Sequence, residues 1–485
     1  MFQVKQIKTG IIWRIIEVVG AEFFAFCSFL ILTRLLAPEH FGVIALATIL
    51  ILVSQLILFQ GVGEALVQRE DINDSYFSSA FWMNLVLAAT AALVLILASD
   101  AIAIVFSEPR FGPVLRAVAP LLLIYAASGI LQAKLRRDLQ LKAFALASIF
   151  ATICGAAVAA LMALQGLEVW SLVGQQWGYA FVSTAMFFIG ARWLPKLFVS
   201  IDQIRQLAGF SFNTIGAAML RFSLRQVDVL FLGFYLPSKQ VGLYFLATRI
   251  LNTVGQLTYY SIQKIGLPIL SRLQNDLVRH HEAIISTFRL TCLVCLPIFL
   301  GMAMTADLFV PLVFGVDWTG SIEPFQILSA FSIFYALSLI ANQILLSIDQ
   351  SSTVLRLSIL NALVFAAAIA YAAPSGIAAT ALAGGLANMA MLPVYFFTLH
   401  RMLKVDLAHL GGELLPILTA GAVMVAGLLL ARHYFLDVLE EIWVLVISII
   451  LGVVLFCATV IIIRRDYVNE VLTFIVGRTS SKTVL

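Results

Sequence analysis

Long runs of apolar residues, separated by short polar breaks, follow one another along the whole chain. A membrane-spanning helix needs about 20 predominantly apolar residues, and runs of that length recur about fourteen times. We predict spanning helices at 10–36, 41–64, 78–106, 113–134, 143–165, 168–191, 208–235, 240–263, 284–310, 321–347, 354–373, 376–400, 412–432 and 442–463. The pattern predicts an all-α, polytopic membrane protein, with loops too short to form a water-soluble domain.

The composition agrees with this prediction. Hydrophobic residues make up 62% of the chain and charged residues 12%, whereas soluble domains average roughly 45–50% and about 25%. The net charge of +4 is small and forms no basic face, which argues against nucleic-acid binding. The first apolar run is too long for a cleaved signal peptide, so we expect it to remain as the first spanning helix.

The placement of Lys and Arg predicts the orientation of the helices. With the N-terminus inside, 21 of these residues fall in inside segments, 5 fall at outside ends and 4 lie within spans. Positive charge concentrates on the cytoplasmic side of membrane proteins. We therefore expect an even number of spans and two cytoplasmic termini.

A weak internal repeat suggests how the spans are grouped. The segment 36–42 leading into Leu46-Ala47-Thr48 is similar to 236–242 leading into Leu246-Ala247-Thr248, at an offset of 200. Further matches occur at offsets of 210 and 211. We predict two parallel six-helix lobes at 1–197 and 205–404, followed by two additional helices and a cytoplasmic tail at 412–485. Lobes related by an axis along the membrane normal occur in transporters that alternate access to a central site.

Polar residues inside the seventh predicted span are the strongest candidates for a functional site. Arg221 and Arg225 are four residues apart, and Asp228 follows three residues later, so all three share one helix face. Asn213 extends the polar stretch. Ionisable residues inside spans are costly and usually face a bundle interior. We predict a cationic cavity in which Arg221, Arg225, Arg249 and Asn213 contact an anionic headgroup, while a structural Arg225–Asp228 ion pair remains an alternative.

Three carboxylates have two open interpretations. Glu17, Glu22 and Asp228 are candidates either for ion coupling or for structural pairing with the arginines. Arg14 and Glu17 are three residues apart on one helix. Arg289 lies close to the cytoplasmic end of the ninth span, where a long side chain can extend to the membrane surface.

Other chemistry finds little support in the sequence. Cys292 and Cys295 have CxxC spacing, but both lie in an apolar run and are expected to be small helix residues. The histidines lie in loops or at helix ends, so we predict no metal site. The sequence contains no phosphate-binding nucleotide motif and no nucleophile elbow, and we expect no cofactor and no enzymatic activity.

Several segments resemble one transporter family. The run LTRLLAPEHFG at 32–42 is similar to the early signature of Wzx-type polysaccharide exporters, and further similar segments lie at 61–69, 80–85, 135–139, 169–176 and 267–274. These exporters belong to the multidrug/oligosaccharidyl-lipid/polysaccharide flippase superfamily, and the colanic-acid and teichuronic-acid branch fits best. The resemblance covers roughly 5–405. Glu64 departs from the small residues more usual at its position.

The resemblance implies a flippase for an undecaprenyl-diphosphate-linked oligosaccharide or a similar lipid-linked glycan. It implies a bacterial inner-membrane location, two six-helix lobes around a cavity, and movement from the cytoplasmic to the periplasmic leaflet. Membrane lipids are the expected surroundings, and a glycan polymerase or glycosyltransferases are candidate contacts. We expect a monomer, because the two halves already form the cavity.

Two rival functions remain. A cation-coupled drug or metabolite exporter of the same superfamily should line its cavity with acids and aromatics, whereas Arg outnumbers Asp and Glu in the second-half spans of this chain. A membrane glycan polymerase or ligase usually needs a sizeable extracytoplasmic loop, and the predicted outside loops are short.

Overall fold

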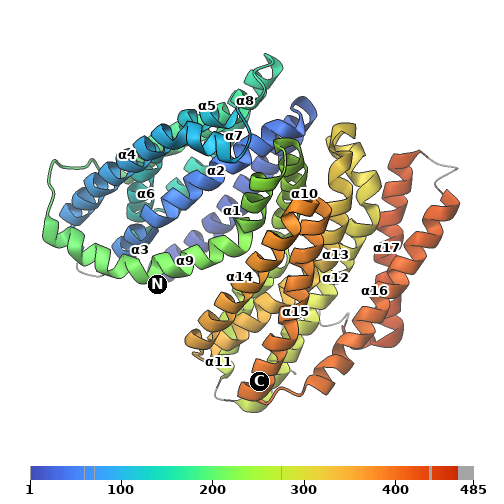
Figure 1. Ribbon diagram of the computed structural model, residues 1–485. Helices are drawn as coiled ribbons and strands as arrows, with labels where there is room; N and C mark the ends of the chain where they lie inside the picture. The colour runs from blue at the N-terminus through green and yellow to red at the C-terminus, as the bar shows by residue number, and fades with distance from the viewer. Residues whose placement is uncertain (1, 59, 70–71, 275, 436–439, 468–485) are drawn as a thin grey trace. The chain divides into compact units, whose positions relative to one another are not determined.

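The computed structural model describes residues 2–58, 60–69, 72–274, 276–435 and 440–467. Within these ranges the side chains of residues 2–11, 58, 60, 61, 208–221, 223–225, 277 and 435 lie outside the description. The described residues are helical almost throughout, and they form two compact units, Met1–Phe245 and Leu246–Leu485. Figure 1 shows both units as bundles of long helices.

The described residues of the N-terminal unit form nine α-helices and the start of a tenth. They are α1 (Phe2–Leu35), α2 (Pro38–Leu58), α3 (Gln60–Gln68), α4 (Asp74–Val105), α5 (Phe111–Val118), α6 (Leu121–Arg137), α7 (Leu141–Leu164), α8 (Val169–Ala191), α9 (Ile201–Tyr235) and α10 (Ser238–Leu257). Helix α9 packs on α2, α3 and α4 and therefore belongs to this unit. The division at 197–205 that the repeat suggests stays a prediction.

The C-terminal unit begins inside α10. Its further helices are α11 (Tyr259–Leu273), α12 (Leu277–Phe314), the 3-10 turn η1 (Val316–Ser321), α13 (Ile322–Ser347), α14 (Ser351–Ala372), the 3-10 turn η2 (Ala373–Ser375), α15 (Ile377–Leu403), α16 (Leu407–Phe435) and α17 (Glu441–Ile463). Helices α16 and α17 pack on each other and on α12.

The helices turn apolar side chains outward. Leu97 of α4, Ile104 of α4 and Ile189 of α8 are 75%, 79% and 75% exposed, and only 17% of the most apolar window of α4 is buried. Contiguous apolar surface of this kind is unfavourable in water but is the expected outer face of a membrane protein. The chain is therefore a polytopic α-helical membrane protein.

Small residues allow the helices to pack closely inside each unit. Along α7 the buried positions include Ala147, Ala151, Gly155 and Ala159. A β-carbon at Gly155 would lie 2.8 Å from the carbonyl oxygen of Gln175 on α8. Small residues drive such packing in membranes, where burial of apolar surface gives little advantage over contact with lipid.

All fourteen predicted spans coincide with helices. Within the described residues, eleven segments are long and apolar enough to cross a membrane, and the remaining three predicted spans fall on α8, α9 and α10 with α11. The predicted span at 113–134 is divided into α5 and α6 at Ala119 and Pro120. Proline lacks the N–H that continues a helix, which explains this break.

Candidate functional site

The seventh-span candidates lie on α9. Its backbone is helical from Ile201 to Tyr235, so the predicted spacing of Arg221, Arg225 and Asp228 on one helix is retained. The side chains of Arg221, Arg225 and Asn213 lie outside the described residues. Their headgroup role therefore stays a prediction.

Asp228 is the one member of this group whose contacts are described. Its carboxylate is buried; one oxygen accepts a hydrogen bond from the Tyr244 hydroxyl at 2.8 Å, and the other accepts one from the Val229 N–H at 2.8 Å. Tyr244 lies on α10, within the N-terminal unit. Asp228 thus joins α9 to α10, an arrangement that the spacing to Arg225 did not indicate.

The remaining candidates occupy different elements. Arg249 is half-buried on α10 in the C-terminal unit, and Glu22 is half-buried on α1 in the N-terminal unit. Glu17, also on α1, forms an ion pair with Arg14, as their spacing suggests. Both roles predicted for Glu17, ion coupling and pairing with the arginines of the seventh and eighth spans, stay predictions.

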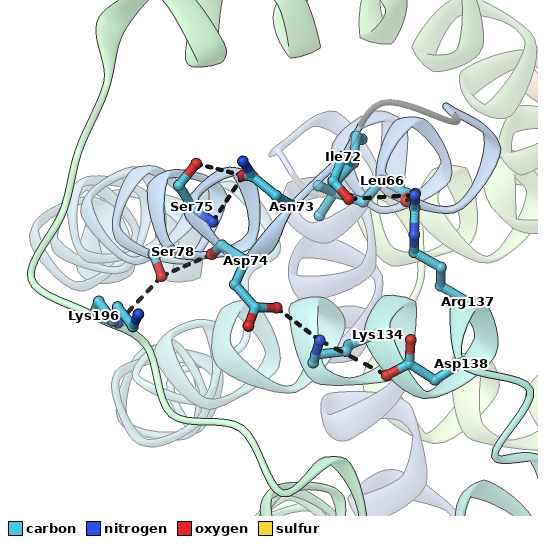
Figure 2. Close-up of polar contacts among 10 residues, drawn as sticks. All are labelled: Leu66, Ile72, Asn73, Asp74, Ser75, Ser78, Lys134, Arg137, Asp138 and Lys196. Atoms are coloured by element: carbon cyan, nitrogen blue, oxygen red, sulfur yellow. Dashed lines mark hydrogen bonds and ion pairs between the residues drawn. The ribbon is translucent and has the colours of Figure 1, made fainter.

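Many basic residues gather at one end of the N-terminal unit, where α4 and α7 begin and α6 and α8 end. We call this the basic end. Lys134, on the last turn of α6, lies 2.9 Å from an Asp74 oxygen and 3.7 Å from an Asp138 oxygen (Figure 2). Its ammonium also stands 5.0 Å from the ring centre of Phe77. It therefore holds the end of α6 against the start of α4.

Arg137 uses its guanidinium differently. It donates to the backbone carbonyls of Leu66 and Ile72 at 2.8 and 3.4 Å (Figure 2). It also donates to the carbonyl of Arg69 at 2.6 Å. These carbonyls belong to the end of α3 and the segment before α4, where helix hydrogen bonds run out. Arg137 thus supplies donors that the backbone lacks, and its charge is committed to the fold.

The segment after α8 is anchored at the same end. The Lys196 N–H donates to the Ser78 hydroxyl at 3.2 Å, and the Trp82 indole N–H donates to the Lys196 carbonyl at 2.8 Å (Figure 2 shows the Ser78 contact). Ser78 in turn donates to the Asp74 carbonyl at 3.0 Å. These bonds fix the path of the chain as it approaches α9.

The opposite end of the unit is held by a close helix crossing. A β-carbon at Gly42 on α2 would overlap the carbonyl oxygen of Ser238, and one at Gly242 on α10 would overlap that of Pro38. Pro38 and Ser238, like Gly42 and Gly242, are 200 residues apart. The two repeated segments therefore meet through equivalent residues, and only glycine allows backbones to approach so closely.

A carboxylate reinforces this crossing. Glu108, in the turn between α4 and α5, accepts a hydrogen bond from the Ser238 hydroxyl at 2.5 Å and one from Arg110 at 3.0 Å. Desolvation raises the pKa of Glu108, but the hydrogen bonds from Arg110 and Ser238 outweigh it, and the net pKa is lowered. The carboxylate is thus held in its charged form at the start of α10.

In the C-terminal unit, Arg289 of α12 does more than extend to the membrane surface. Its guanidinium donates to the Glu413 carboxylate of α16 at 2.7 Å and stands 4.8 Å from the ring centre of Tyr467. At the far end of α16, Arg432 pairs with Asp307 of α12. The prediction that Arg289 simply extends to the surface was incomplete, because its partner lies 124 residues away.

The cysteines take no part in these clusters. Cys292 and Cys295 are buried on α12 with free thiols. Among the described residues, no group of three His, Cys, Asp or Glu side chains is placed to hold a metal ion.

The fold is similar to that of two solved membrane proteins. A solved structure of the lipid II flippase MurJ in an inward closed conformation covers 94% of this chain and 100% of its own, with a TM-score of 0.79 and 14% identity. An inward-facing multidrug resistance MATE transporter of the MOP superfamily covers 80% of this chain and 98% of its own, with a TM-score of 0.59 and 14% identity. At such identities the likeness establishes the fold alone.

The family described as "Polysaccharide biosynthesis protein" matches residues 31–323, more than half of the chain. The chain belongs to this family, which confirms the resemblance found in its sequence.

Curated relatives include the succinoglycan biosynthesis transport protein ExoT of Rhizobium meliloti, 25% identical over 65% of this chain and 64% of the relative. The teichuronic acid biosynthesis protein TuaB of Bacillus subtilis is 21% identical over 67% of this chain and 68% of the relative. The lipopolysaccharide biosynthesis protein WzxC of Escherichia coli is 20% identical over 61% of each chain. The chain thus matches about two thirds of the length of these relatives.

Proposed function

We propose that this protein is a flippase that carries a lipid-linked oligosaccharide, such as an undecaprenyl-diphosphate-linked glycan, from the cytoplasmic to the periplasmic leaflet of a bacterial inner membrane. The observation that carries the proposal is the family match over residues 31–323. Relatives named for succinoglycan transport and for teichuronic acid and lipopolysaccharide biosynthesis support it. The protein acts as a transporter without catalysing a reaction, as a monomer with both termini in the cytoplasm.

A lipid-linked oligosaccharide needs a protein to cross the membrane. A diphosphate and a chain of sugars lose their hydration in hydrocarbon and do not cross unaided. A cationic path lets the headgroup pass while the lipid tail stays in the bilayer. Arg forks match phosphate oxygens in geometry, so Arg221, Arg225 and Arg249, with Asn213, bind the headgroup. The carboxylates Asp228, Glu17 and Glu22 serve coupling or pairing.

A second function rests on one observation. The MATE transporter fold is shared over 80% of this chain, so a cation-coupled drug or metabolite exporter is the alternative. The excess of Arg in the second-half spans favours an anionic substrate.

Deletion of the gene in its own host separates the two functions. A flippase predicts loss of a surface glycan and accumulation of its lipid-linked precursor, with unchanged drug sensitivity. A variant with both Arg221→Ala and Arg225→Ala should fail to restore the glycan, whereas Arg401→Ala, an exposed site at the end of α15, should restore it. Drug hypersensitivity with normal glycan would replace the proposal with the alternative.

A further inference from the structure

Two guanidinium groups share one aromatic ring at the basic end of the N-terminal unit. The central carbon of Arg136, on the last turn of α6, lies 5.1 Å from the ring centre of Phe144, and that of Arg14, on α1, lies 5.9 Å from it. Both distances are within the range of a cation–π contact. The ring of Phe144 is itself buried and stacks on Phe187, with centroids 5.4 Å apart. Burial and the contact with Phe187 hold the Phe144 ring in place, so both guanidiniums contact a ring of defined position.

A second pair of this kind lies beside the first in sequence. The ammonium of Lys142, on the first turn of α7, stands 5.4 Å from a ring centre of Trp13, the neighbour of Arg14. We call Trp13, Arg14, Arg136, Lys142 and Phe144 the aromatic–basic cluster. Trp together with Lys or Arg is typical of the level at which lipid headgroups meet water. The cluster thus combines three cations on α1, α6 and α7 with the kind of aromatic residue that is common at the headgroup level.

Arg136 differs from the other basic residues on α6. Lys134 contacts two carboxylates and Arg137 donates to three carbonyls. Arg136 is exposed, and its guanidinium makes neither a hydrogen bond nor an ion pair with the residues that the structure describes. Its planar fork therefore retains donors for a partner outside the protein.

The electrostatics of the cluster favour an anion. Arg14 repels Arg136, while Glu17 and Glu64 attract it from a distance. Glu17 is already paired with Arg14, whose side chain is still 52% exposed. A bound dianion would lower the repulsion between the two guanidiniums and accept hydrogen bonds from both. Both guanidiniums contact the same ring, so they form one positively charged site rather than two separate ones.

We infer that the aromatic–basic cluster is a binding site for the phosphate group of a membrane lipid, with Arg136 as its principal donor and Arg14 and Lys142 as its flanking cations. The choice of ligand rests on the proposed function. The ligand is the diphosphate headgroup of the lipid-linked substrate, which is held at the membrane surface before it enters the helix bundle. The cluster contains none of the residues predicted on α9 and α10, so capture at the surface is separate from binding inside the bundle.

The test measures binding with the full-length protein in nanodiscs. Three probes are used: undecaprenyl diphosphate in phosphatidylcholine, phosphatidylglycerol in phosphatidylcholine, and inorganic diphosphate in solution. The variants are Arg136→Gln, Arg136→Lys, and Arg14→Gln combined with Arg136→Gln. Arg205→Gln is the matched control, since Arg205 is an exposed arginine of the same unit on the first turns of α9.

We expect Arg136→Gln to weaken binding of undecaprenyl diphosphate roughly ten- to a hundredfold, because charged hydrogen bonds are lost. Arg136→Lys should keep part of the affinity through its charge, the double variant should lose more, and the control should change less than about twofold. The three probes identify the source of the phosphate. Preference for undecaprenyl diphosphate supports substrate capture, and equal binding of phosphatidylglycerol supports a general site for lipid phosphate.

The inference is overturned if Arg136→Gln and the double variant bind all three probes as the control does while remaining monodisperse and helical. Its failure is distinguishable from failure of the proposed function. If the wild type transports lipid-linked glycan and Arg136→Gln transports it with the same dependence on substrate concentration, the phosphate site is ruled out. The proposed flippase function then still stands. If phosphate binding depends on Arg136 but the protein moves no lipid-linked glycan, the phosphate site stands. The proposed flippase function is then ruled out.

Discussion

The arginines of α12 and α16 in the C-terminal unit and Arg136 at the end of α6 in the N-terminal unit are used in opposite ways. Arg289 pairs with Glu413 and Arg432 with Asp307, so both charges are neutralised and α16 is tied to α12 near both of its ends. Arg136 rests on an aromatic ring with its hydrogen-bond donors directed to no described residue. The number of basic residues does not distinguish a paired arginine from one such as Arg136. The contacts of each guanidinium do.

The largest effect is expected where a paired charge is least exposed. Glu413→Ala leaves Arg289, whose side chain is 19% exposed, without its carboxylate, and should lower the free energy of unfolding by about 3 kcal/mol. Thermal unfolding in detergent measures this loss. Glu440→Ala, at an exposed position before α17, is the control.

Replacing both partners sharpens the result. The double variant Arg289→Met with Glu413→Leu should recover most of the lost stability, because no charge remains buried without a partner. If the double variant is less stable than Glu413→Ala, the ion pair itself stabilises the unit. The loss in Glu413→Ala would then not be due mainly to the unpaired charge of Arg289.

The next effect concerns the crossing of α2 and α10. Gly42→Ala places a methyl group against the carbonyl oxygen of Ser238, and overpacking of this kind costs about 1–3 kcal/mol. We expect a lower unfolding temperature than for Gly63→Ala on α3, where a β-carbon would meet no atom within 4 Å. Equal unfolding temperatures for the two variants would contradict the close crossing.

A smaller, pH-dependent effect is expected at Glu108. Because its pKa in the folded protein is lowered from 4.5, its contribution to stability is complete above pH 4.5 and is lost as the pH falls through the lower folded value. Glu108→Gln should cost about 1 kcal/mol at pH 7 and should converge with the wild type in strong acid. Unfolding measured from pH 7 to pH 3 tests this, and a constant difference across that range would contradict it.

The smallest effect is expected for an exposed ion pair. Arg116 lies 2.9 Å from Asp100, but the two side chains are 46% and 72% exposed. Water and salt screen such pairs, so Asp100→Asn should change the free energy of unfolding by less than about 0.5 kcal/mol. A loss comparable to that of Glu413→Ala would show that exposure does not separate the two kinds of pair.

The helices were predictable from sequence, but their contacts were not. Apolar runs of spanning length appear directly in the chain, so all fourteen predicted spans fall on helices. The Arg14–Glu17 pair was also visible, because its members lie one helical turn apart. The Arg289–Glu413 pair was not, since helix packing joins residues 124 positions apart.

The cluster on α6 illustrates the same limit. The adjacent residues Arg136 and Arg137 lie in a segment that resembles the exporter family. Nothing in their order indicates that the Arg137 side chain is hydrogen-bonded to the protein and that the Arg136 side chain is not. That difference arises because Arg137 faces the unpaired carbonyls at the end of α3, while Arg136 faces Phe144. Only the packed unit determines it.

The most direct test of the account is transport by purified protein in sealed proteoliposomes. Undecaprenyl-diphosphate-linked oligosaccharide is placed in one leaflet, and its arrival in the other is followed with a membrane-impermeant glycosidase. We expect protein-dependent exchange that falls strongly when Arg221→Ala and Arg225→Ala are combined and stays near the wild-type rate with Arg401→Ala. Exchange no faster than in protein-free liposomes would contradict the proposed flippase, and exchange unaffected by the paired substitution would contradict the proposed headgroup contacts on α9.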